Sequence, residues 1–182
     1  SAWLERELCE GEAVALSELK AWLLPRQYPE ALNAAVRFLT ARQRSAAEVR
    51  RKLEAKPYLD ETIEMVLYKL EKEKLLDDAA FAADWAKARS QRQVGGKRIA
   101  QELQRLGIAS ALAQEAVAGL DQAEGEEAAL AVAAKLLKRY QNEPDARKGM
   151  NKLMAAMARR GYSFAESERA VQAAIARARE EE

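Results

Sequence analysis

Histidine is absent from this 182-residue sequence, and cysteine occurs once, at Cys9. The lack of histidine removes the commonest general base and the commonest metal ligand of proteins. A single cysteine excludes an internal disulfide and a zinc site built of several cysteines, and it favours a reducing, cytoplasmic setting. The stretch "VGGK" at 94–97 lacks the spacing of a phosphate-binding loop. We therefore expect no metal, no cofactor and no enzymatic activity.

Proline and glycine are scarce, with 4 and 8 residues, and hydrophobic runs are short. No apolar stretch approaches the roughly 20 residues that span a bilayer, so we expect no membrane association. Hydrophobic residues make up 49% of the chain and charged residues 32%. With its abundant alanine, this composition is typical of a water-soluble, mostly helical protein, and we expect it to be a monomer.

One short pattern occurs three times along the chain. It reads "RSAAEVRRKLEAKPY" at 44–58, "VGGKRIAQELQRLGI" at 94–108 and "GMNKLMAAMARRGY" at 149–162. Each copy carries two apolar residues four apart, which lie on one face of a helix; the pairs are Val49 and Leu53, Ile99 and Leu103, and Leu153 and Met157. An apolar residue follows each pair, and we expect these three to lie in the core at repeat junctions: Tyr58, Ile108 and Tyr162.

The repeat predicts an all-helical protein, an elongated array of three tandem three-helix repeats behind a short N-terminal helical segment. We place the N-terminal segment at 1–29 and the three repeats at 30–76, 77–121 and 122–182. Within the N-terminal segment, a helix over 12–24 is expected to close at a proline, Pro25.

Local signals mark the expected helix ends. Ser45 with Glu48, and Ser163 with Glu166, have the spacing of a capping box. Aspartates are also expected to cap helices: Asp60 in the first repeat, and Asp77 or Asp78 in the second. Glycines that can adopt a left-handed conformation are expected to stop the middle helices of the last two repeats, at Gly107 and Gly161.

The net charge is only +1, but the basic residues form clusters in each repeat, one of them in the middle of the chain. Residues 86–106 hold six lysines and arginines against one acid, Glu102, a local charge of +5. Arginine can fork onto phosphate or carboxylate, although a solvated helix face is the alternative interpretation. We predict a partner-binding group of seven residues, the last two being secondary: Arg89, Arg92, Lys97, Arg98, Arg105, Arg50 and Arg51.

Two sets of residues resemble the RecX family of recombination regulators. Arg42, Ser45 and Glu48 are similar to its first-repeat pattern. The second repeat resembles the most recognisable block of the family, with "LLDD" at 75–78 and "KRIAQELQRLGI" at 97–108 around the aromatic pair Phe81 and Trp85. The similarity covers roughly residues 30–177. Some family members carry a small β-rich segment before the helices, and because "LERELCEGEAVALSELK" resembles only its tail, we expect a truncated N-terminus.

The resemblance implies a modulator of the RecA recombinase. Family members bind the RecA filament on single-stranded DNA and inhibit its ATPase, strand exchange and growth, which tempers homologous recombination and the SOS response. The basic centre of the chain would then face RecA or the DNA. Two alternatives stay open: an independent DNA-binding protein made of homeodomain-like three-helix units, and a helical scaffold for another protein.

Overall fold

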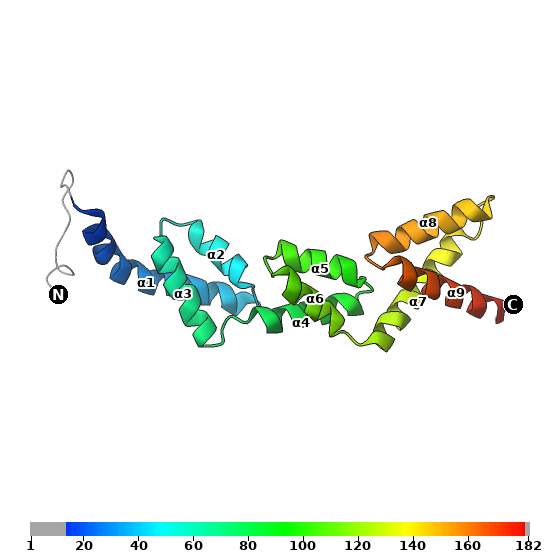
Figure 1. Ribbon diagram of the computed structural model, residues 1–182, viewed down its shortest axis with the longest axis horizontal. Coiled ribbons are helices and arrows are strands. Elements are labelled where there is room, and N and C mark those ends of the chain that lie inside the picture. Colours follow the sequence, from blue (N-terminus) through cyan, green and yellow to red (C-terminus); the bar gives the residue numbers. More distant parts are fainter. Residues whose placement is uncertain (1–13, 181–182) are drawn as a thin grey trace. The chain divides into compact units, whose positions relative to one another are not determined.

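The computed structural model describes residues 14–180 of the chain. The described part of the chain forms two compact units, which divide between Asp78 and Ala79. Every regular element in the described part is an α-helix (Figure 1), which confirms the predicted all-helical class of three tandem three-helix repeats. The first 13 residues, which include Cys9 and most of the segment expected to be truncated, lie outside the described residues.

Three helices make up each repeat, in the order that the sequence predicts. The helices of the first repeat are α1 (Leu16–Ala41), α2 (Ala46–Glu54) and α3 (Asp60–Lys72). Those of the second are α4 (Asp78–Gln91), α5 (Gly96–Arg105) and α6 (Ser110–Ala118). Those of the third are α7 (Gln122–Tyr140), α8 (Ala146–Arg159) and α9 (Phe164–Glu180).

The core of the first repeat forms around the middle helix α2. Its two apolar residues, Val49 and Leu53, are fully buried, as predicted from their spacing. Alanines on α1 allow close approach of the helices, because their side chains end at Cβ. The residues that α1 and α3 add to this core are Ala31, Ala35, Ile63, Val66, Leu67 and Leu70. Burying a large aliphatic side chain contributes about 1.5–3 kcal/mol, so these contacts hold the three helices together.

Helix α1 is longer than predicted, because it continues through Pro25 and Pro29, and the expected stop at Pro25 is wrong. A proline removes one backbone N–H and crowds the carbonyl four residues before it. The two prolines lie four residues apart on an exposed side of the helix, where water can bind the carbonyls left without a donor. Gln27 ties this stretch to α3 by accepting hydrogen bonds from the backbone N–H of Leu59 (2.9 Å) and the hydroxyl of Thr62 (3.1 Å).

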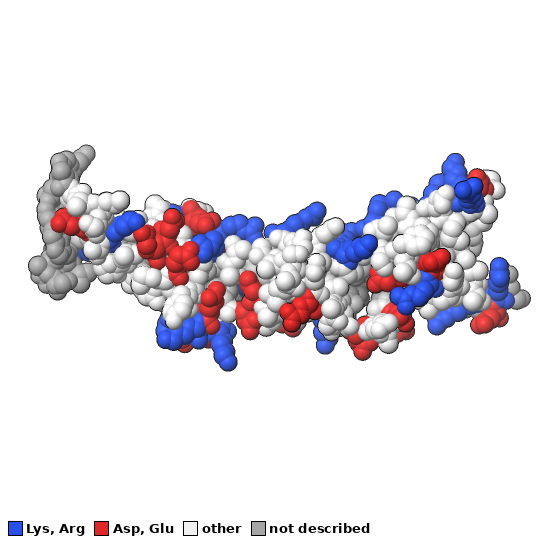
Figure 2. Space-filling model, viewed as in Figure 1, with Lys and Arg blue, Asp and Glu red and all other residues white. Residues whose placement is uncertain are grey.

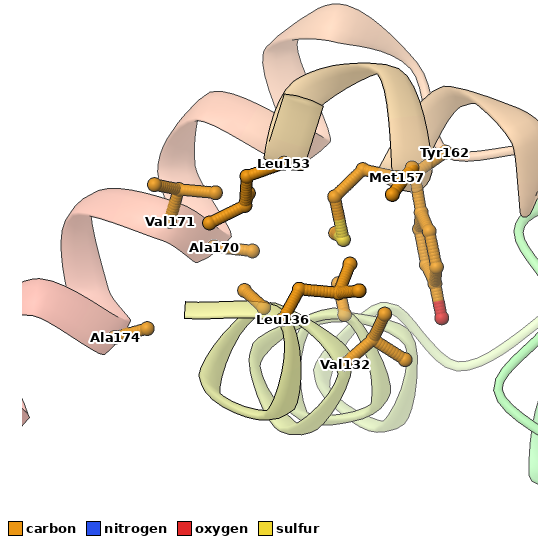
Figure 3. Close-up of a cluster of buried hydrophobic side chains, with 11 residues drawn as sticks. Val132, Leu136, Leu153, Met157, Tyr162, Ala170, Val171 and Ala174 are labelled. Atoms are coloured by element: carbon orange, nitrogen blue, oxygen red, sulfur yellow. The ribbon is translucent and has the colours of Figure 1, made fainter. Parts of the chain in front are cut away.

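The second and third repeats each contain a core of their own. In the second, Ile99 and Leu103 of α5 are fully buried, and the ring of Trp85 packs 5.8 Å from that of Phe81. In the third, α7 and α9 pack on α8 around the side chains drawn in Figure 3. The labelled members of that cluster are Val132, Leu136, Leu153, Met157, Tyr162, Ala170, Val171 and Ala174. Because the two cores are separate clusters, each repeat buries its own apolar face.

Both predicted capping boxes are present. The Ser45 hydroxyl accepts the backbone N–H of Glu48 (3.2 Å), and the Glu48 carboxylate accepts that of Ser45 (3.3 Å). Ser163 and Glu166 make the same pair of bonds at 3.2 and 2.6 Å. Each box satisfies backbone donors that have no partner inside the helix, so both starts carry a local signal in the sequence.

Asp60 differs from the prediction, and Asp78 bonds to a helix of the first repeat. Asp60 is the first residue of α3 rather than its cap, because Leu59 occupies the capping position and makes no side-chain cap bond. The carboxylate of Asp78 accepts the backbone N–H of Ala46 (2.9 Å), so it caps α2, which precedes it by 32 residues. The glycine stops behave as expected, with φ of 92° at Gly107 and 93° at Gly161.

We expect Leu103→Ala to lower the free energy of unfolding of the second unit by about 2–5 kcal/mol, the range for large-to-small changes in a core. Gln101→Ala on the exposed side of the same helix should change it by less than about 0.5 kcal/mol. Urea denaturation followed by circular dichroism measures both. An equal effect of the two substitutions would contradict the assignment of Leu103 to the core.

Candidate anion-binding groove

A groove of about 280 Å³ lies between α5 and the end of α8 in the second unit, and we call it the α5–α8 groove. Its lining residues are Lys97, Arg98, Gln101, Glu102, Arg105, Ala158, Arg159 and Gly161. Four of these carry a positive charge and one a negative charge. Figure 2 shows basic side chains over α5 and at the adjoining end of α8. Such an arrangement attracts anions, and arginine in particular can bind phosphate or carboxylate with two hydrogen bonds.

The spacing of polar residues on α5 places the basic side chains on one face. Lys97, Gln101 and Arg105 follow each other at intervals of four, which keeps them above one another on a helix. Ile99 and Leu103 occupy the opposite face and are buried. The core contact of this helix therefore determines which side carries the positive charge.

Arg89 belongs to the interior of the second repeat rather than to the groove. It is half-buried, and its Nε and NH2 atoms donate to the two carboxylate oxygens of Glu102 at 2.6 and 2.7 Å. Arg98 Nε donates to the same carboxylate at 3.2 Å. Burial alone would raise the pKa of Glu102, but the two arginines hold it below its ordinary value. Glu102 therefore stays ionised and joins α4 to α5.

The structure brings three of the seven predicted residues into the groove: Lys97, Arg98 and Arg105. Arg92 follows α4 and is exposed, outside the groove lining. Arg50 and Arg51 lie on α2 of the first unit, where Arg50 NH1 pairs with Glu64 at 2.7 Å and Arg51 Nε donates to the Ala47 carbonyl at 3.1 Å.

Arg159 is a groove residue that the predicted binding group did not include. It lies at the end of α8, more than 50 residues from the central basic cluster. Within residues 14–180, the side chains of Lys97, Arg105 and Arg159 have no ion-pair or side-chain hydrogen-bond partner. The two consecutive arginines before Gly161 are the only sequence feature that could have pointed to Arg159, but their position beside α5 depends on tertiary contacts.

A larger hollow of about 720 Å³ lies among α6, α7 and α9 of the same unit. Its rim carries carboxylates, among them Asp121, Glu126, Glu127 and Glu166, beside Arg169 and Arg177. Tyr162 lines this hollow, and its hydroxyl has no hydrogen-bond partner among the described residues. The acidic rim would repel a polyanion, so the α5–α8 groove is the better candidate for an anionic partner.

No group of three or more potential metal ligands occurs in the described part of the chain. None of the helices within residues 14–180 combines the length and the apolarity needed to cross a bilayer.

The fold and the groove define a protein built of three consecutive three-helix domains with a basic surface in its second unit. Family models match all three domains: "RecX, first three-helix domain" at residues 31–70, the second at 77–117 and the third at 124–171. The chain belongs to the RecX family.

Curated relatives agree with this assignment, and a solved structure shares the fold. "Regulatory protein RecX" of Mycobacterium ulcerans is 38% identical over 141 residues, covering 76% of this chain and 81% of the relative. The protein of the same name from Streptomyces coelicolor is 31% identical over 168 residues, covering 91% and 89%. The crystal structure of RecX from Lactobacillus salivarius superimposes with a TM-score of 0.78 at 24% identity, over 83% of this chain and 98% of the other, and shares the fold.

We expect Glu102→Gln to destabilise the second repeat, because it leaves the half-buried Arg89 without its counter-charge. The expected loss is about 1–2 kcal/mol, since a charged hydrogen bond contributes about 1.5–3 kcal/mol when buried and less when partly exposed. Glu115→Gln, on the exposed side of α6, is the control and should have no measurable effect. Thermal unfolding near neutral pH compares them; equal melting temperatures would contradict a structural role for Glu102.

Tyr162 generates a prediction at high pH. Burial, with a contribution from Glu166, raises its pKa from 10.0 to about 12. Between these values an unfolded tyrosine has lost its proton while the native one keeps it, so stability falls as pH rises through this window and is unaffected below it. The phenolate absorbance of the wild type minus that of Tyr162→Phe should show a titration near pH 12. A titration near the ordinary value would refute the burial of this hydroxyl.

Proposed function

We propose that this protein is a non-enzymatic regulator that binds the RecA filament on single-stranded DNA and inhibits its ATPase, strand exchange and growth. It would act in the cytoplasm and temper homologous recombination and the SOS response. Membership of the RecX family, whose curated relatives are named regulatory proteins, supports a regulatory role. The observation that carries the proposal is the α5–α8 groove, which presents a concave basic surface to an anionic partner.

The charges of the groove are suited to binding. Lys97, Arg105 and Arg159 are not neutralised by the described protein, so their charge is available to phosphates or carboxylates. Arg98 shares Glu102 with Arg89, which already makes two shorter bonds to that carboxylate. An anionic partner can therefore compete for Arg98 without removing the last counter-charge from Glu102.

The structure gives less support to the alternative in which the third helix of a repeat binds the major groove of duplex DNA. Helix α3 carries Glu61 and Glu64 on its exposed surface, and both carboxylates have pKa values lowered by hydrogen-bonded basic partners, Lys20 and Arg50 respectively. They are thus negatively charged at neutral pH, and phosphates would repel them. A recognition helix that enters the major groove normally presents donors and positive charge.

The single-stranded-DNA-dependent ATPase of RecA, titrated with this protein, tests the proposal. We expect the wild type to inhibit, and the triple charge reversal Lys97→Glu, Arg105→Glu and Arg159→Glu to raise the half-inhibitory concentration by at least about tenfold, because each lost contact costs on the order of 0.5 kcal/mol or more. Arg89 and Arg98 are left unchanged so that the structural ion pair with Glu102 persists.

The matched control reverses the same number of charges outside the groove, in Lys87→Glu, Lys138→Glu and Arg147→Glu. It should inhibit like the wild type, and both triple variants should retain helical circular dichroism. Inhibition by the groove variant equal to that of the control would show that this surface does not bind. Absence of inhibition by the wild type with a cognate RecA would overturn the proposed function itself.

A further inference from the structure

The second and third repeats meet end to end through their backbones. The N–H of Gly95 donates to the Arg160 carbonyl at 2.8 Å, and the N–H of Lys97 donates to the Gly161 carbonyl at 3.1 Å. These donors lie at the start of α5, where a helix has no internal acceptors for its N–H groups, and the acceptors follow the end of α8. Each helix end thus satisfies the other, and the positive end of one helix dipole faces the negative end of the other.

Two glycines make this approach sterically possible. A Cβ on Gly95 would lie 2.3 Å from the Gly161 carbonyl carbon and 2.4 Å from the Tyr162 nitrogen. Conversely, a Cβ on Gly161 would lie 2.4 Å from the Cβ of Arg98. Carbon atoms in van der Waals contact are about 3.5–4.0 Å apart, so neither position accepts a side chain while the repeats stay in place. We call this pair of contacts the glycine joint.

The requirement for glycine at position 95 comes from the neighbouring repeat and not from the backbone conformation of Gly95 itself. Its φ of −74° and ψ of 155° belong to the extended region that every residue adopts readily. Elsewhere in the same unit, a Cβ on Gly125 of α7 would meet no atom within 4 Å, and replacement of this glycine should cost nothing. The three atoms nearest to a Cβ at Gly95 all belong to the third repeat, which is therefore the main obstacle to alanine there.

The glycine joint is also what completes the α5–α8 groove. Lys97, Arg98 and Arg105 come from the second repeat, while Arg159 comes from the third. Arg98 crosses the joint, because its NH1 atom donates to the Arg159 carbonyl at 3.4 Å. The apolar cores of the two repeats are separate clusters, so each can stay folded when the joint opens.

We propose that the glycine joint positions the two halves of the groove, and that opening it weakens binding of the anionic partner without unfolding either repeat. This inference rests on the proposed function of the groove. A rigid joint presents the four basic residues in one arrangement before binding, so that less conformational entropy is lost when the partner docks. Gly95 lies outside the groove lining and thus acts as a positioning residue that need not touch the partner, whereas Gly161 both forms the joint and lines the groove.

The test is Gly95→Ala in the full chain, with Gly125→Ala as the control. Two readouts are needed: the distance distribution between spin labels at Gln114→Cys on α6 and Gln172→Cys on α9, in a Cys9→Ser background, and the inhibition of RecA ATPase. We expect Gly95→Ala to broaden the distribution and to raise the half-inhibitory concentration at least about tenfold, a loss of about 1.4 kcal/mol. Circular dichroism should be unchanged, and the control should match the wild type.

Gly161→Asn provides a second variant that approaches the joint from the other side. Asparagine tolerates a positive φ better than most residues, so it preserves the end of α8 while its Cβ meets Arg98, and it should reproduce both effects.

Two results in the folded Gly95→Ala and Gly161→Asn variants would overturn the joint as a positioning element. One is an unchanged spin-label distance distribution, and the other is a broadened distribution with full inhibition of RecA. If the wild type fails to inhibit RecA, the proposed function falls, while the spin-label distances still decide whether the joint holds the repeats.

Discussion

Each repeat depends on one contact, the burial of two apolar residues one turn apart on its middle helix. Val49 and Leu53 provide it in the first repeat, and Leu153 and Met157 in the third. Because these side chains occupy one face of a short helix, the outer helices must pack against that face. The same burial determines which residues point outward, so the basic surface of the middle helix follows from the apolar contact.

The basic residues have different roles, and their local contacts show which role each one has. Arg89 is joined to Glu102 by two short hydrogen bonds in a half-buried setting, so it stabilises the second repeat. Lys97 and Arg105, on the exposed side of the next helix, have no such partner among the described residues. The net charge of a segment therefore overstates how many of its basic residues can bind a partner, because some of them form ion pairs that hold helices together.

The contact between the second and third repeats creates a surface that neither repeat has by itself. At the glycine joint, the backbone groups at the start of α5 and after α8 satisfy one another at distances that exclude a Cβ on either side. Arg159 is thereby placed beside Arg98, and the groove acquires a wall from each repeat. The concave basic surface therefore needs both α5 and the end of α8, because it lies between them.

The all-helical class, the three repeats and their buried pairs were predictable from the sequence, since helical periodicity is a local property of neighbouring residues. So were the capping boxes at Ser45 and Ser163, whose partners lie three residues away. Three other features depend on contacts in the folded protein: α1 continues through Pro25, Asp78 caps α2, and Arg89 pairs with Glu102. Tertiary contacts also place Arg159 in the groove. These outcomes depend on contacts between residues 13 or more positions apart, or on packing of the helix against its neighbours, and such contacts leave no periodic signal in the sequence.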